Sequence, residues 1–168
     1  AALMGDTVAD VLRCIDQGVA SAGTLPKGTI YLFDGVGPRQ RVLSGNPPAD
    51  QRAPAIAALA RLGIRAVARQ GHELKGEQDV LGYFTGATHV NVDGLRFLPG
   101  ALADHLTSFG RIIRGRNGQM PITRFLAAGA TGSYGTVEEP TNIFLRFPQA
   151  WVFERYAAGF SMVEAYWM

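Results

Sequence analysis

Short apolar runs rich in β-forming residues constrain the fold of this chain most strongly. The clearest run covers residues 29–33, Thr-Ile-Tyr-Leu-Phe, and it ends at Asp34-Gly35. Because the run is apolar throughout and does not alternate, it is typical of a strand that is buried on both faces of a parallel sheet. Residues 64–68 and 80–86 are interpreted as two further strands. We therefore expect a parallel sheet at the centre of the fold.

Helical patterns precede the first two of these strands, and others follow later in the chain. A first helix is predicted from Asp6 or Thr7 to Ala22, because Thr7 and Asp10 resemble a capping box. Its apolar residues recur at helical spacing and form one stripe, Val8, Val11, Leu12, Ile15 and Val19. Further helices are predicted over residues 54–62, 121–128 and 148–158, and from the capping box at Ser161 onward. Strands that alternate with helices favour the α/β class.

Two more extended segments complete the predicted sheet. Residues 97–110 are interpreted as a strand whose pairing begins after Pro99, because proline has no N–H to donate. Residues 129–137 are interpreted as a glycine-rich strand, in which the glycines indicate close approach by another backbone or a ligand. This strand would carry Glu138 and Glu139 at its carboxyl end, where open α/β sheets place their sites. We predict a mainly parallel sheet flanked by helices in three layers.

Length and composition limit the organisation and the partners. A chain of 168 residues suits a single domain over residues 1–168, and the net charge of +2 is too small to favour nucleic acid or an acidic membrane surface. The single cysteine, Cys14, excludes an internal disulfide and is interpreted as a structural thiol. No apolar run approaches the roughly 20 residues of a membrane helix, and no signal peptide is evident.

The C-terminal region is rich in aromatic residues. It ends in Tyr166-Trp167-Met168, and a helix that ends in this way would expose apolar surface. We therefore expect a fragment of a longer polypeptide, or a subunit that binds a protein partner. The aromatic residues predicted to serve that contact are Trp151, Phe153, Tyr166 and Trp167.

Polar residues follow several of the predicted strands and would meet at one edge of the sheet. A hydrolase with an acid/base site built from Asp104, His105, Ser108 and Glu138 is one interpretation. No GxSxG elbow supports it, and polar residues also gather at strand ends because loops are polar. The loop at residues 111–118 contains Arg111, Arg114 and Arg116, which suit either an exposed loop or an anion site.

A metal or a nucleotide has less support. His89, Asp93 and His105 are suitable types of metal ligand, but no HxH, HExxH or DxDxDG spacing accompanies them. Neither GxGxxG nor GxxxxGK[ST] is present, so no phosphate-binding loop is indicated. We expect no metal and no cofactor.

Several long motifs resemble an uncharacterised family of large exported bacterial proteins. They include Leu-Thr-Ser-Phe-Gly at 106–110 and Gly-Ala-Thr-Gly-Ser-Tyr-Gly-Thr-Val-Glu-Glu-Pro at 129–140. Arg111 stands where that family usually has a second glycine after Ser-Phe-Gly. The resemblance implies a periplasmic or extracellular location and a chain longer than this one, and it assigns no activity.

The order of elements is distantly similar to the catalytic subdomain of gingipain-type cysteine peptidases, which have a caspase-like fold. Residues 83–86 resemble the strand before their catalytic histidine, and residues 97–109 resemble the strand that carries their cysteine. The histidine position then falls on Ala87, and the cysteine position falls near Ala103 or Asp104. The resemblance therefore implies a pseudo-peptidase. Its expected role is a non-catalytic binding or structural component of a larger assembly.

Overall fold

The computed structural model describes residues 2–35, 43–44, 49–114, 117–141 and 143–168. Arg116 and most of the segment between residues 35 and 48 lie outside these residues. Two short strands, β2 (Leu43–Ser44) within that segment and β3 (Ala49–Asp50) just after it, pair antiparallel. No strand was predicted there from the sequence.

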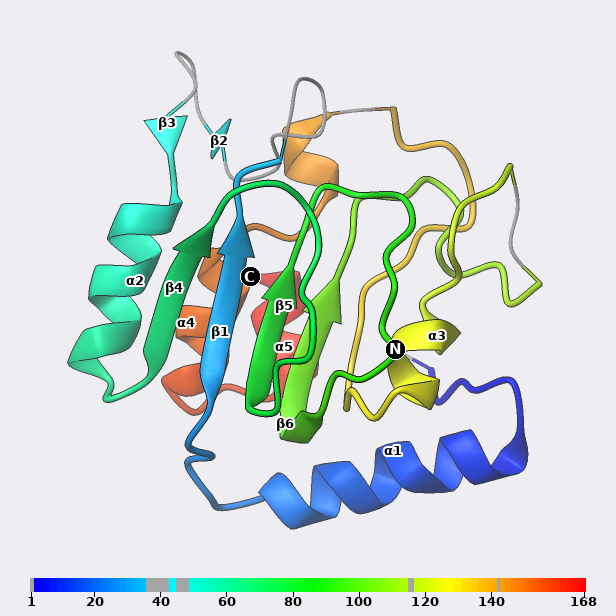
Figure 1. Cartoon of the computed structure of the whole chain (residues 1–168), viewed down its shortest axis with the longest axis horizontal. Coiled ribbons are helices and arrows are strands. Elements are labelled where there is room, and N and C mark those ends of the chain that lie inside the picture. Colours follow the sequence, from blue (N-terminus) through cyan, green and yellow to red (C-terminus); the bar gives the residue numbers. More distant parts are fainter. Residues whose placement is uncertain (1, 36–42, 45–48, 115–116, 142) are drawn as a thin grey trace.

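A parallel sheet of four strands forms the centre of the molecule (Figure 1). Its strands are β1 (Thr29–Phe33), β4 (Arg65–Arg69), β5 (Val80–Phe84) and β6 (Phe97–Asp104), in the spatial order β4-β1-β5-β6. Every residue of β1 and of β5 is buried, as their continuous apolar sequences predict. The predicted α/β class with a parallel sheet is confirmed.

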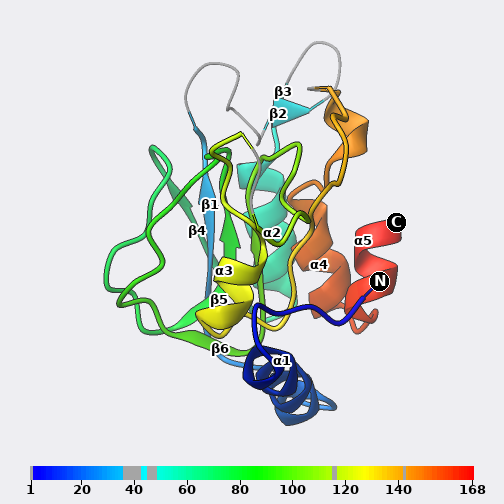
Figure 2. The same ribbon diagram turned by 90° about the vertical axis from the view of Figure 1, so that its right-hand side faces the viewer.

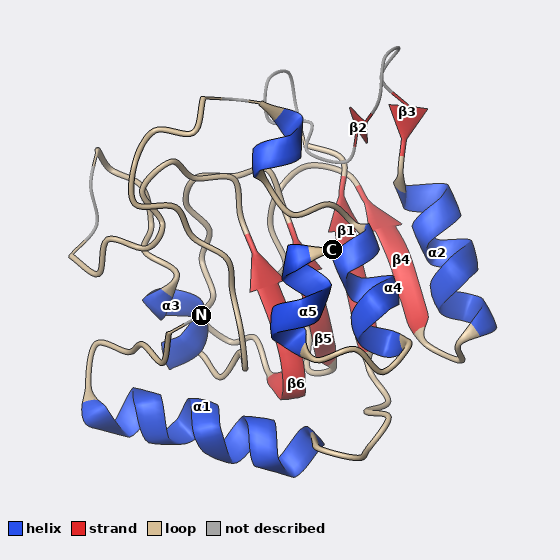
Figure 3. Ribbon diagram, turned by 180° about the vertical axis from the view of Figure 1, so that it is seen from behind, coloured by secondary structure: helices blue, strands red, loops and turns tan. Residues whose placement is uncertain are grey.

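The helices lie mostly on one face of the sheet (Figure 3). There α2 (Arg52–Arg61), α4 (Trp151–Ala157) and α5 (Met162–Trp167) form a layer, while α3 (Thr123–Ala127) lies toward the other face (Figure 2). Connecting segments after β4 and β5 cover most of that second face. A short 3₁₀ helix, Phe144–Arg146, precedes α4. The sheet is therefore flanked on both sides, by helices on one and mainly by loops on the other.

Capping boxes begin the first and last helices. In α1 (Val8–Ser21), the Thr7 hydroxyl accepts from the Asp10 N–H at 3.2 Å, and the Asp10 carboxylate accepts from the Thr7 N–H at 3.0 Å. In α5, Ser161 and Glu164 make the same reciprocal pair. Each pair satisfies backbone donors that a helix start would otherwise leave open. Both capping boxes were predicted from the sequence and are confirmed.

The apolar stripe of α1 faces solvent. The side chains of Val8, Leu12, Ile15 and Val19 are 77%, 55%, 41% and 71% exposed. The residues of α1 that are buried are Asp10 and Cys14. The helix crosses below the sheet and packs against β6 and α3 (Figure 1). Arg13 fixes it there, because Nη1 donates to the Ala127 carbonyl at 2.7 Å and to the Asp10 carboxylate at 3.1 Å.

The predicted strand over residues 129–137 is wrong. Gly129 turns the chain at a φ of +108°, and the next residues then run beside β6. The Thr131 N–H donates to the Ala101 carbonyl at 2.8 Å, and the Ala103 N–H donates to the Gly132 carbonyl at 3.0 Å. These bonds form one isolated bridge, between Leu102 and Gly132. Beyond it the chain turns to the loop after β6 and adds no further rungs.

The predicted close approach by another backbone holds for Gly135, whereas Gly132 lies against a side chain. A Cβ at Gly135 would lie 2.7 Å from the Arg111 backbone nitrogen. A Cβ at Gly132 would overlap the Met162 sulfur of α5. Both glycines are therefore required by close packing, in the first case against backbone and in the second against a helix side chain.

The boundaries of β6 also differ from expectation. Pairing was expected to begin after Pro99, but Phe97 already pairs with Val80. The register then shifts, and regular pairing resumes at Leu102 opposite Gly82. Gly100, at a φ of +83°, absorbs this irregularity. The strand ends at Asp104, whereas the sequence interpretation extended it to residue 110.

Alternate side chains of the strands enter two separate cores. Tyr31, Phe33 and Tyr83 point to the loop-covered face, whereas Ile30 and Leu32 point to the helices.

In the described part of the chain, no helix has the length and apolar character that a membrane span requires.

The helix layer is seated on a glycine of β5. A Cβ built at Gly82 would lie 2.7 Å from Cε1 of Phe153 on α4 and 2.8 Å from Cγ2 of Ile30 on β1. The Phe153 ring also meets Phe84 edge to face, with centroids 6.0 Å apart. The missing side chain at Gly82 thus provides the space that the Phe153 ring occupies.

We predict that Gly82→Ala lowers the free energy of unfolding by about 1–3 kcal/mol, because the added methyl group overpacks the core. Urea denaturation measures the change. Gly18→Ala is the matched control, since the nearest atom to its added Cβ lies 4.0 Å away and the site is helical. Equal effects of the two substitutions would contradict the account of Gly82.

A carboxylate joins the loop before β5 to β1. Asp79 accepts from the Thr29 hydroxyl at 2.7 Å through Oδ2 and from the Tyr31 hydroxyl at 2.7 Å through Oδ1. The hydrogen bond from Thr29 is the main cause that lowers the pKa of Asp79, although partial burial opposes it. The ionised carboxylate is therefore the form that stabilises the fold.

We predict that Asp79→Asn lowers the free energy of unfolding at pH 7 by about 1–2 kcal/mol, since two hydrogen bonds to a charged group are weakened. Because the folded-state pKa is lowered, this stabilisation is present above the unfolded-state pKa of about 4 and is lost as the pH falls below it. Urea unfolding between pH 7 and pH 3 should show the gap between wild type and variant closing. A constant gap, or the same loss in Asp93→Asn at the exposed Asp93, would contradict the prediction.

Candidate functional site

The carboxyl edge of the sheet is closed by hydrogen bonds from the end of β5 to the loop around His72 and to β6. The Thr85 hydroxyl donates to the His72 carbonyl at 2.9 Å, and the Tyr83 hydroxyl donates to the same carbonyl at 2.8 Å. The Thr85 N–H donates to the Asp104 carbonyl at 3.0 Å, which extends the pairing of β5 and β6. The edge that the sequence marked as a candidate site is therefore covered by the loop around His72.

His105 belongs to the core and is only 1% exposed. Its Nε2 lies 2.7 Å from the Met120 carbonyl oxygen, and its ring packs edge to face on Phe125 with centroids 5.1 Å apart. Because a carbonyl can only accept, Nε2 carries the proton in this contact. That nitrogen is thus engaged in joining the loop after β6 to the segment before α3.

The four residues of the hydrolase interpretation do not share one accessible cleft. Asp104 is fully buried, like His105, whereas Glu138 is exposed on the surface. Ser108 is half-buried, and its carbonyl accepts from the Thr136 hydroxyl at 2.6 Å. None of the four lines either cavity described below. A substrate in solution would therefore not meet these groups together.

The candidate metal ligands also lie apart. His89 and Asp93 are exposed, and His105 lies in the core. Within the described residues, no three His, Cys, Asp or Glu side chains form a group that could hold a metal ion. The Cys14 thiol is buried in α1, and burial raises its pKa, so the thiolate is disfavoured.

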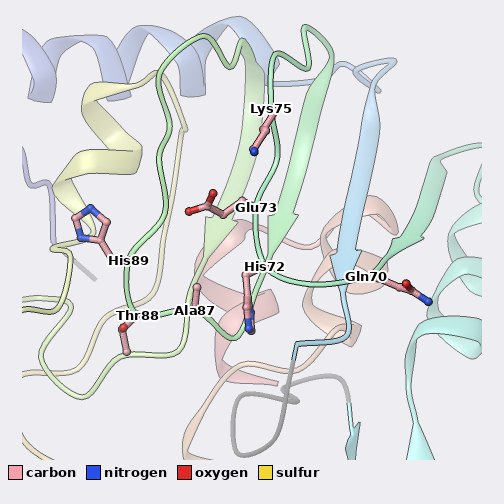
Figure 4. A pocket seen from close by; sticks show the side chains of 7 residues that line it. All are labelled: Gln70, His72, Glu73, Lys75, Ala87, Thr88 and His89. Atoms are coloured by element: carbon pink, nitrogen blue, oxygen red, sulfur yellow. The ribbon is translucent and has the colours of Figure 1, made fainter.

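A polar depression of about 580 Å³ lies near Ala87, the position that resembles the histidine site of the gingipain-type peptidases. Its lining includes His72, Glu73 and His89 (Figure 4). In Figure 4 the rings of His72 and His89 extend in different directions and do not face each other. His72 is half-buried, and no sequence signal marked its carbonyl as an acceptor for the hydroxyls of Tyr83 in β5 and of Thr85 just after it.

A larger cavity of about 750 Å³ lies at the C-terminal region. We call it the C-terminal groove. It is lined by residues 133–135, by residues 145–149 and by side chains of α4 and α5, with Arg111 and Ile122 beside them. The glycine-rich segment and the aromatic C-terminus, which are separate features of the sequence, thus line the same cavity.

Aromatic side chains shape this groove. Trp151, Tyr166 and Trp167 line it, and these include both tryptophans of the chain. The ring of Tyr134 stacks on Tyr166 with centroids 6.2 Å apart. Phe153 was predicted to join the same surface, but it is 2% exposed and packs in the core over Gly82.

The mouth of the groove exposes apolar surface. Leu145 is 84% exposed, Trp167 is 82% exposed and Met168 is 58% exposed. All three line the groove. Large exposed apolar patches on globular domains mark interaction sites more often than chance.

Arginines are the charged side chains of the groove. Arg111, Arg146 and Arg155 line it, and no Asp or Glu does so in the part of the chain that the structure describes. Glu138 and Glu139, which the sequence placed at the site, are exposed outside it. Sequence reasoning marked Arg111 but missed Arg146 and Arg155. The one available signal was the spacing of Trp151 and Arg155, which lie one helical turn apart.

Comparison with known proteins leaves the family open. No protein-family model, no curated protein and no solved structure matches this chain. The similarity to exported bacterial proteins and to gingipain-type peptidases therefore stays a prediction from the sequence, and the structure establishes the α/β class with its parallel sheet.

Proposed function

We propose that this chain is a non-catalytic binding component of a larger protein assembly in the periplasm or outside the cell. The observation that carries the proposal is the C-terminal groove, which combines about 750 Å³ of space with exposed aromatic and aliphatic side chains. Cavities of this size and lining are the usual form of binding sites. The partner would contact Trp151, Tyr166 and Trp167.

The positions that resemble a peptidase dyad support a role without catalysis. Ala87 and Ala103 have no group that could act as nucleophile or base, and the carboxylate of Asp104 is fully buried. A cysteine peptidase needs a thiolate and a base within hydrogen-bond reach. In this proposal the fold serves as a scaffold, and the binding surface lies on the helix-covered side of the sheet.

We predict no hydrolytic turnover of casein or of nitrophenyl esters above the rate of the double variant Asp104→Asn/Ser108→Ala. The reason is that the acid/base residues of the hydrolase interpretation are not gathered at an accessible site. Absorbance assays of released peptide and nitrophenolate measure the rate. Turnover by the wild type that this double variant loses would contradict a non-catalytic role and would restore the hydrolase interpretation.

We predict that peptides selected on the wild-type protein from a display library bind Trp167→Ala at least about tenfold more weakly, a loss of about 1.4 kcal/mol. Trp167 is 82% exposed, so its truncation removes groove surface with little effect on the core. Fluorescence anisotropy of labelled peptides gives the affinities. Phe160→Ala is the control, because Phe160 is an exposed aromatic residue that does not line the groove. Equal losses in both variants would argue against the groove as the binding site.

A further inference from the structure

The C-terminal groove has an imbalance of charge. Three arginines line it, whereas no Asp or Glu side chain does so among the described residues. The ion pairs in the described part of the chain involve Arg13, Arg52 and Arg69, and none involves an arginine of the groove. The chain as a whole carries a net charge of only +2, so the positive lining is a local feature.

The three arginines differ in how they are held. Arg146 is fixed, because its Nη1 donates to the Pro140 carbonyl at 2.6 Å and to the Thr141 hydroxyl at 3.2 Å. Arg155 lies one helical turn after Trp151 on α4, so a guanidinium and an indole lie on the same side of that helix. Arg111 lines the groove beside Gly135, and its backbone N–H donates to the Thr136 carbonyl at 3.0 Å.

This arrangement is complementary to a ligand that is both apolar and negatively charged. Guanidinium groups bind carboxylates through paired, charge-assisted hydrogen bonds, which gain strength where aromatic side chains exclude water. Lone positive groups beside a hydrophobic surface also discriminate against cationic partners, because like charges there repel each other. The groove has a volume of about 750 Å³, which suits a few side chains of a peptide. Its surface is concave, whereas a bilayer presents a flat surface.

We propose that the groove binds an acidic, apolar peptide segment of a protein partner. Its bulky apolar side chains lie against Trp151 and Trp167, and its carboxylates pair with Arg155 and Arg111. This inference rests on the proposed binding function of the same groove and adds the chemistry of the partner.

Both tryptophans of the chain line the groove, so tryptophan emission reports on this site without interference from another indole. The probes are three amidated, N-acetylated peptides: Gly-Glu-Leu-Phe-Glu-Leu-Gly, a version with glutamine for glutamate, and a version with lysine. We expect the acidic peptide to shift the emission and to bind at least about tenfold more tightly than the glutamine peptide. The lysine peptide should bind most weakly. Of the three peptides, only the acidic one should lose affinity when salt is added.

Two substitutions locate the contact. Arg155→Gln and Arg111→Gln should each weaken the acidic peptide severalfold and leave the glutamine peptide unchanged. Arg61→Gln is the matched control, because Arg61 is exposed at the end of α2 and does not line the groove. The comparison of peptides on the wild type needs no variant, so it tests the charge preference even where a variant fails to fold.

The possible failures are distinguishable. If the three peptides bind equally well, the groove is a binding site and the proposed function stands, but the inference about charge is overturned. If none of them shifts the emission, the inference fails together with the proposed function of the groove. If phosphatidylglycerol vesicles shift the emission and the acidic peptide does not, the groove serves a membrane surface and the peptide proposal is overturned.

Discussion

The packing of Phe153 over Gly82 holds the rest of this structure in place. The ring occupies the space that a side chain on β5 would fill, and it meets Phe84 edge to face. This contact fixes α4 on the sheet, and α4 in turn presents Trp151 and Arg155 to the C-terminal groove. The geometry of the groove is therefore set by a glycine in the middle of a buried strand.

The second side of the groove depends on the segment that follows Gly129. Its hydrogen bonds to β6 extend the sheet by a single bridge, and Met162 of α5 then packs on Gly132. The side chain of Tyr134, which belongs to this segment, stacks on Tyr166, and its hydroxyl donates to the Arg146 carbonyl at 2.9 Å. A run that looks like a strand in the sequence thus becomes one wall of a cavity.

The sheet could be predicted from the sequence because short, continuous apolar runs are typical of buried parallel strands. The caps of α1 and α5 could be predicted because their hydrogen bonds join residues close in sequence. The candidate site could not be predicted in the same way. Polar residues at the end of a strand have the same local sequence pattern whether they are exposed or buried. Asp104 and His105 are buried because loops distant in sequence cover them, and the local sequence does not show this. Residues 129–137 have the composition of a strand, but the number of rungs depends on neighbouring backbones that local sequence does not specify.

The orientation of α1 has a thermodynamic consequence. Its periodicity specifies an apolar stripe, and in this structure Val8, Leu12, Ile15 and Val19 remain in contact with water. These side chains stay hydrated in both the folded and the unfolded state, so they add little to the heat capacity of unfolding of the isolated chain. Any molecule that covers the stripe would reveal itself calorimetrically, through a negative change in heat capacity on binding.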